Sequence, residues 1–185
     1  MTRLEAIHSF RFLSSVQEPD AEFIPFKAPD RAVFYQKFAE QGIVLPDYNR
    51  FKRKFLRRRD MMTLMSPLNV RFAYKDREYS FTANEGACWD GASVPTMFVC
   101  CNVSKFNHYV ILASLLHDAF FALHLMPFED ANNIFSAVLR YHDLGNLALL
   151  RYMMGVRSPI AHKLYRKSDV SGHWLNGFID FHTLV

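Results

Sequence analysis

Apolar and polar residues alternate in one part of the chain, on both sides of the turn sequence "KDRE". Before the turn the apolar positions include Leu68, Val70 and Phe72, and "YSFTA" repeats the pattern after it. Such alternation is typical of strands with one buried face. We therefore expect a β-hairpin over residues 64–83, with its turn near Asp76.

Five other segments carry the pattern of helices. The segment "NHYVILASLLHDAFFAL" is apolar nearly all round, which is typical of a buried helix. Proline, glycine and capping residues separate it from its neighbours, and Gly42 ends the first of the five segments. The expected helices cover residues 29–42, 107–123, 127–143, 145–157 and 158–168.

Together these elements predict an α+β fold, in which a β-hairpin or small antiparallel sheet packs on a helical core. We expect an N-terminal helical extension with a basic segment over residues 1–60, and a core domain over residues 61–167. The last stretch, residues 168–185, is aromatic and is broken by two glycines. It predicts a C-terminal extended arm that wraps over the body of the protein or over a neighbouring subunit.

Composition narrows the class of protein. With 185 residues the chain can bury one substantial core, and its 50% hydrophobic content argues against disorder. The 18 phenylalanines are a heavy apolar load, part of which we expect to face a partner subunit. The formal charge of +4 is mild for a nucleic-acid binder, which normally carries a more concentrated basic face.

The number of cysteines and the length of the apolar runs indicate the cellular compartment in which the protein is made. The three cysteines, Cys88, Cys100 and Cys101, are an odd number without framework spacing, so we expect reduced thiols and no disulfide scaffold. No apolar run is long enough to span a bilayer, and the first residues lack the apolar core of a signal peptide. We therefore expect a soluble protein, without a membrane span, that is made in a reducing cytoplasm.

The loop "DGASVP" is the first candidate site. Gly91 allows backbone angles that other residues resist, and Ser93 can cap the helical turn that follows. In one interpretation, Asp90 and Ser93 only bond loop amides. In the other, Asp90 is a metal ligand or general base, or Ser93 is a nucleophile, although Pro95 stands where a hydrolase elbow has glycine.

The second candidate site lies within the buried helix, at His117 and Asp118. An ionised carboxylate among apolar residues needs a partner. The candidates for Asp118 are an arginine (Arg140 or Arg151), a metal ion, or the loop amides near Asp90. His117 can border the same pocket only at the helix edge, because adjacent helical residues point about 100° apart.

The next helix contains two polar residues that are unusual in a helix interior, Asn132 and Asn133. We expect one of them to face inward and to bond a polar group on the neighbouring helix. His117 and Asp118 are the natural partners.

Four blocks of the chain, in this order and spacing, resemble a known family: "DGASVP", "ASLLHDAFF", "EDANNIFSAVLRYHD" and "LALLRYMMGVRSPIAHK". They are similar to the blocks of a family of small phage and prophage proteins filed as domain of unknown function 1353. The resemblance covers roughly residues 64–167. It implies a strand hairpin, a glycine-rich loop and successive helices in a phage setting, and it implies no agreed activity.

The resemblance places the family's polar set on Asp90, Ser93, His117 and Asp118, and its helix aspartate on Asn132. If the family's acids bind a metal, this chain has lost one anionic ligand, and asparagine suits zinc less well than hard cations. We therefore expect a structural or vestigial polar cluster of these five residues. The alternative is one divalent metal ion held by Asp90, His117 and Asp118.

A third candidate is the basic run "RFKRKFLRRRD", which begins at residue 50. It predicts contact with nucleic-acid phosphates, a solvated helix face, or an interface arm that pairs with acidic neighbours. The residues that would contact phosphate or a partner are Lys52, Arg53, Lys54, Arg57, Arg58 and Arg59.

Two functions from different classes fit these features. The one we expect is a non-enzymatic virion component, associated with the tail or baseplate, that needs no cofactor and binds other virion proteins in a symmetric assembly. It would be made in the host cytoplasm and reside in the virion, with nucleic acid as a weaker partner candidate. The alternative is a small hydrolase of cell-wall or nucleotide bonds, with Asp90, His117 and Asp118 around one metal ion.

Overall fold

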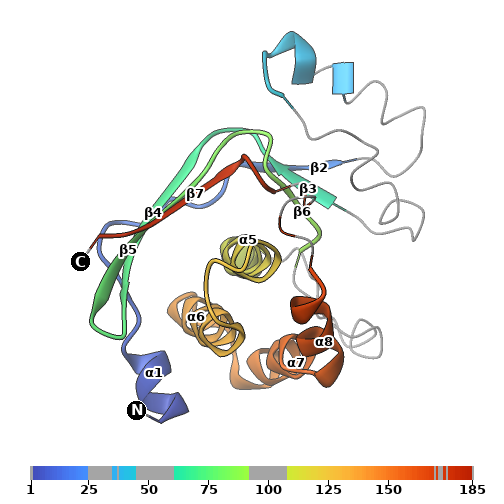
Figure 1. Ribbon diagram of the computed structural model, residues 1–185. Helices are drawn as coiled ribbons and strands as arrows, with labels where there is room; N and C mark the ends of the chain where they lie inside the picture. Colours follow the sequence, from blue (N-terminus) through green and yellow to red (C-terminus); the bar gives the residue numbers. More distant parts are fainter. Residues whose placement is uncertain are drawn as a thin grey trace.

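A computed structural model gives the structure of residues 2–24, 35, 36, 38–44, 61–91, 108–168, 170, 173 and 175–184. Within these residues, two antiparallel sheets cover a layer of helices, which confirms the expected α+β class (Figure 1). The first sheet has the order β1 (Arg11–Phe12), β4 (Leu68–Tyr74), β5 (Arg77–Ala83) and β7 (Ile179–Thr183). The second has the order β2 (Ala21–Ile24), β3 (Met61–Leu64) and β6 (Cys88–Trp89).

The predicted hairpin is formed by β4 and β5. Its two central turn residues, Lys75 and Asp76, have φ angles of 50° and 61°, as a type I′ turn requires, so the expected turn position is confirmed. The start was predicted too early, because Leu64 ends β3 of the other sheet. Pro67 separates the two strands, since a proline has no N–H to give to a ladder.

The concave face of the first sheet packs on the helices. In Figure 1, β4, β5 and β7 arch over α5 (His108–Ala122) and α6 (Phe128–Tyr141). Phe120 of α5 lies at the centre of this contact, with ring centroids 6.2 Å from Phe72, 5.7 Å from Phe81 and 5.2 Å from Phe181. The prediction from the alternating apolar residues is therefore confirmed, because one face of the hairpin is buried against a helix.

The helices expected after the loop are present at nearly the expected bounds. Besides α5 and α6, they are α7 (Asn146–Val156) and α8 (Pro159–Arg166). The Ser158 hydroxyl caps α8 by accepting a hydrogen bond from the Ala161 N–H at 3.1 Å. No helix among the described residues is long and apolar enough to cross a membrane.

Strands from both ends of the chain complete the sheets. The N-terminal segment contains α1 (Arg3–His8) as well as β1 and β2, which pair with β4 and β3, so strands accompany a helix in its described part. Residues 29–34 and 37 of the predicted first helix lie outside the described residues. Its end is confirmed, since Gly42 has a φ of 76° and the Ile43 N–H bonds the Phe38 carbonyl at 2.9 Å.

The C-terminal arm forms β7 and lies on its own chain. Phe181 is opposite Phe81 in the pairing of β7 with β5, and its ring stacks on Tyr79 at 5.5 Å. Of the two positions expected for the arm, the described residues therefore occupy the one over the body of the protein.

Candidate functional site

The predicted polar contact between the two central helices is present. His117 of α5 and Asn132 of α6 are both buried, and the His117 Nε2 lies 3.0 Å from the Asn132 Oδ1. With the amide oxygen facing the ring, His117 donates its Nε2–H to Asn132. The imidazole is held between Phe135 and Phe121, at centroid distances of 5.0 and 5.6 Å. We call His117 and Asn132 the inter-helix pair.

One donor of the inter-helix pair is left over. The Asn132 side chain has no exposed surface, and its Nδ2 has no hydrogen-bond partner among the described residues. A buried donor without an acceptor costs about 1–3 kcal/mol. The pair is therefore only partly satisfied within the described structure.

Asp118 stands at the edge of the inter-helix pair. Its side chain is 15% exposed, and its Oδ1 lies 3.9 Å from the His117 Nδ1, which is within range of an ion pair and too long for a hydrogen bond. Asp118 also takes part in another interaction, so its carboxylate is not isolated. This matches the expectation that a carboxylate in this helix needs partners.

Asp90 follows β6 directly, on the neighbouring sheet. The Trp89 Nε1 donates a hydrogen bond to the Ser114 hydroxyl at 3.0 Å, which fixes β6 against α5. Ser114 and Asp118 are four residues apart and therefore lie on the same side of this helix. Asp90 itself takes part in an interaction.

Several predicted site residues lie outside the described residues. They are Ser93 of the loop and the basic residues Lys52, Arg53, Lys54, Arg57, Arg58 and Arg59. Among the residues that are described, no group of three or more His, Cys, Asp or Glu side chains is placed to hold a metal ion. The metal hypothesis for Asp90, His117 and Asp118 stays a prediction, since the loop after Gly91 is not part of the described structure.

A second polar cluster was not predicted as a site. At the tip of the hairpin, the Tyr74 hydroxyl donates to the Asp130 Oδ1 at 2.9 Å, and the Lys75 Nζ lies 2.6 Å from the same oxygen. The Asn133 Nδ2 donates to the Tyr74 hydroxyl at 3.3 Å, and the Arg157 Nη2 donates to the Asn133 Oδ1 at 2.7 Å. We call these five residues the hairpin-tip network.

The hairpin-tip network joins three elements through a chain of bonds. It links the end of β4 to the first turn of α6 and to the end of α7. Burial raises the pKa of Tyr74 well above its ordinary value, which keeps the hydroxyl protonated as a donor. The only signal in the sequence was the pair of asparagines inside α6, because Tyr74 and Asp130 have ordinary positions for a strand residue and a first-turn acid.

Cys88 is a buried thiol that forms no disulfide within the described residues, and its Sγ–H donates to the Gly86 carbonyl at 3.2 Å. Burial raises its pKa to about 12. Since the thiolate is the reactive form, Cys88 has neither nucleophilic nor metal-binding character near neutral pH. Cys100 and Cys101 lie outside the described residues.

The sequence model of a family described as "Protein of unknown function (DUF1353)" matches residues 63–155, slightly more than half of the chain. The chain belongs to this family. The DUF1353 match runs from β3 into α7, so it contains the inter-helix pair and all of the hairpin-tip network except Arg157. It ends before residue 167, where the resemblance was expected to end. Searches of curated proteins and of solved structures found no match.

Proposed function

We propose that this DUF1353 protein is a structural or assembly component of a phage virion, associated with the tail or baseplate. The resemblance of its four sequence blocks to a family of phage and prophage proteins is the ground for this setting. The observation that carries the proposal is an exposed apolar surface on α7 and α8. We call it the α7–α8 face, and it consists of Leu147, Leu150, Met154, Ile160 and Leu164.

Helix α7 is apolar on two faces. Leu149, Tyr152 and Val156 are buried in the core. Leu147, Leu150 and Met154, spaced by three and four residues, form a second stripe in which each side chain is more than half exposed. A helix on the surface of a monomer normally turns polar residues to solvent, so the second stripe is typical of a helix that a partner covers.

Helix α8 contributes exposed apolar residues of its own, beside charged ones. Ile160 and Leu164, four residues apart, are both more than half exposed. In Figure 1, α7 and α8 lie together on the side of α5 and α6 that faces away from the arch of the sheet. The apolar side chains therefore point away from the core that the sheet and α5 build.

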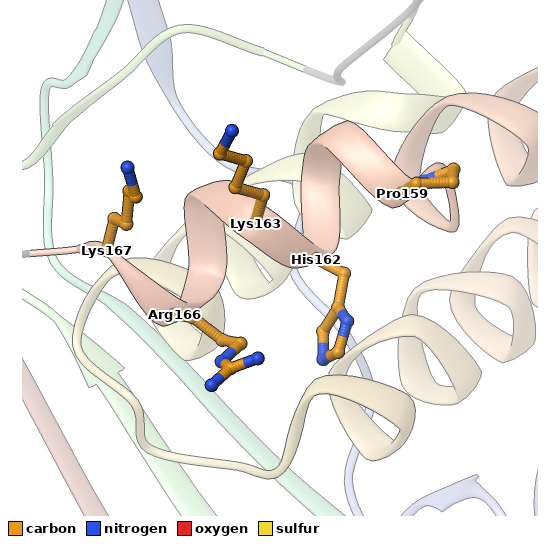
Figure 2. Close-up of a pocket in the computed structure, with 5 residues that line it drawn as sticks. All are labelled: Pro159, His162, Lys163, Arg166 and Lys167. Atoms are coloured by element: carbon orange, nitrogen blue, oxygen red, sulfur yellow. The ribbon is translucent and has the colours of Figure 1, made fainter.

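Positive charge lies beside the apolar side chains of α8. An open hollow of about 340 Å³ is lined, within the described residues, by Pro159, His162, Lys163, Arg166 and Lys167. Figure 2 shows His162 and Arg166 projecting from one side of the helix and Lys163 and Lys167 from the other. None of these residues is acidic, so the complementary surface would be apolar with acidic side chains at its rim.

A protein subunit fits this surface better than nucleic acid does. Burying one exposed leucine contributes about 1.5–3 kcal/mol, and five apolar side chains at one contact would supply the core of a specific interface. Phosphates would engage the cations of α8 and leave Ile160 and Leu164 without contacts. The proposal therefore takes neighbouring virion proteins as the partners.

The test is association with particles of the phage that encodes the chain. The wild-type protein is expected in purified particles at a fixed ratio to other virion proteins, measured by quantitative mass spectrometry. Leu150→Glu with Leu164→Glu should remove it, because a buried glutamate carboxylate is costly. Leu4→Glu, at an exposed leucine of α1, is the matched control and should not. Absence of the wild type from particles would refute the proposal.

The second candidate is the metal-dependent hydrolase. The position of Asp118 beside His117 favours it, since the His117 Nδ1 and the Asp118 carboxylate are both groups that bind divalent metal ions. In this alternative, Asp90, His117 and Asp118 would bind one divalent ion, which would activate a water molecule. Stoichiometric divalent metal in purified protein, lost in Asp118→Asn, would establish the metal site.

A further inference from the structure

Among the described strands, the first sheet ends in β7, whose outer edge pairs with no other strand. In the order β1–β4–β5–β7, the edge strand β1 has two residues and β7 has five. The sequence of β7, "IDFHT", contains no proline, lysine or glycine, which are the residues that commonly protect an edge from pairing. Within the described residues, β7 pairs with β5 alone.

The hydrogen-bond pattern shows which backbone groups face outward. The Leu184 N–H bonds the Glu78 carbonyl and the Asn84 N–H bonds the Phe178 carbonyl, both at 2.8 Å. Because bonded pairs alternate along an antiparallel ladder, the even-numbered residues of β7 carry the bonds to β5. The N–H and C=O groups of the odd-numbered residues therefore point away from β5, at Ile179, Phe181 and Thr183.

We infer that β7 pairs antiparallel with β7 of a second copy of this chain, about a two-fold axis at Phe181. Such a pairing places Phe181 opposite Phe181 of the second copy and Ile179 opposite its Thr183. All of these residues have outward backbone groups, so each opposed pair exchanges two hydrogen bonds. The two four-stranded sheets become one continuous sheet, with the same strand on both sides of the interface.

The side chains of Asp180 and His182 favour this pairing register over the registers whose axis is shifted by one residue. With Phe181 on the axis, Asp180 lies opposite His182 of the second copy, and His182 lies opposite Asp180. These are non-hydrogen-bonded pairs, whose side chains approach most closely, so each acid meets an imidazole. Moving the axis to Asp180 would oppose two carboxylates, and moving it to His182 would oppose two imidazoles. Both side chains are exposed, so they are free to make these contacts.

The residues directly opposite this charge pair within the chain are uncharged. In the pairing of β7 with β5, Asp180 is opposite Thr82 and His182 is opposite Ser80. Changing the charges of Asp180 and His182 therefore disturbs no ion pair across that ladder. The inference does not depend on the proposed virion function, because it concerns two copies of the isolated chain and a different surface from the α7–α8 face.

The first test measures self-association of the full chain by analytical ultracentrifugation over a range of concentrations. The wild type is expected to dimerise, and Thr183→Pro to raise the dimer dissociation constant by more than about tenfold, since it removes an outward N–H from two symmetric contacts. Thr183→Val keeps that N–H and should dimerise like the wild type. A wild type that stays monomeric, or a dimer that Thr183→Pro leaves intact, would overturn the inference.

The second test exchanges the charges and does not rely on proline. His182→Asp opposes two carboxylates at both symmetric positions and should weaken the dimer about fivefold. Adding Asp180→Lys to this variant opposes a cation to the new acid and should restore wild-type affinity. Circular dichroism would verify that each variant is folded. A double variant that dimerises no better than His182→Asp would exclude the register centred on Phe181.

Discussion

The inter-helix pair and the hairpin-tip network each contain one of two adjacent asparagines of α6, and the two amides differ in how fully they are bonded. In the hairpin-tip network, Asn133 donates to Tyr74 and accepts from Arg157, so both ends of its amide are bonded. One position earlier on the same helix, Asn132 accepts from His117 and has no acceptor for its Nδ2 among the described residues. The network also has a donor without a partner, since the buried Arg157 Nε has no hydrogen bond among the described residues, so the contrast lies between the two asparagines and not between whole clusters.

The comparison also shows that the residues of a family motif need not be those that contribute most to the stability of the fold. The motif "HD" and the helix position of Asn132 drew attention to the inter-helix pair. The hairpin-tip network carries more bonds and links elements far apart in the sequence, yet no motif marks it. We therefore expect the network to contribute more to stability than the pair does.

The largest effect is expected for Asn133→Ala. It removes the acceptor of the Arg157 Nη2 and one of the two hydrogen-bond partners of the Tyr74 hydroxyl, and it should destabilise the fold by about 3 kcal/mol. Chemical denaturation would measure the loss. Asn69→Ala, which removes an exposed amide that bonds the Thr82 hydroxyl, is the control and should cost less than about 0.5 kcal/mol. Equal costs for the two variants would contradict the structural role of the network.

A smaller effect is expected at Asp118, where the outcome depends on the replacement. Asp118→Ala removes the carboxylate that lies beside His117 and that takes part in a further interaction. It should lower the free energy of unfolding by about 2 kcal/mol. Asp118→Asn keeps the oxygen acceptor and should cost about half as much. Denaturation of both variants, in buffer with and without a chelator, distinguishes this from a metal site, where the two variants would be equally destabilised and the chelator would destabilise only the wild type.

Alkaline pH should weaken the network and not the pair. The folded-state pKa of Tyr74 is raised above the ordinary value of 10.0, so its contribution is fully present below pH 10 and is lost as the pH rises further. The loss is at most about 1.4 kcal/mol per pH unit. Tyr74→Phe should reduce the slope of stability against pH above pH 10. Asn132→Ala should leave that slope unchanged, and a reduced slope there would contradict the assignment.

The smallest effect is expected for Asn132→Ala. The His117 Nε2–H loses its acceptor, but the variant also removes the unsatisfied Nδ2, so the two contributions partly cancel. A net cost of about 1 kcal/mol should appear in denaturation, well below that of Asn133→Ala. A stability loss as large as that of Asn133→Ala would show that the Asn132 Nδ2 is bonded in the native protein. The two asparagines would then not differ in their bonding.

Sequence reasoning succeeded where the pattern is long and local. The hairpin has a period of two residues and α6 to α8 have apolar positions at helical spacing, while α5 was predicted from its long, uniformly apolar run. The shorter strands gave no such signal. Every residue of β3 is buried, so it has no alternation, and β6 has only two residues. Strand β7 exists through its pairing with β5, about a hundred positions earlier, which no local pattern contains.

The same limit applies to the candidate site. The bond between His117 and Asn132 was predictable because a polar residue inside an apolar helix needs a partner on the next helix. The bond between Tyr74 and Asp130 was not, because both residues have positions that are common without any special contact. The α7–α8 face was missed because an apolar helical stripe has the same period whether the core or a partner covers it.

The central claim is that the protein acts through its exposed apolar surface and not through the polar cluster of the family motif. The most direct measurement is competition for places in assembling particles between wild-type chain and one variant at a time, quantified by isotope labelling. We predict that Asp118→Asn is incorporated as well as the wild type and that Leu150→Glu with Leu164→Glu is excluded. Incorporation of the surface variant together with exclusion of Asp118→Asn would contradict the account.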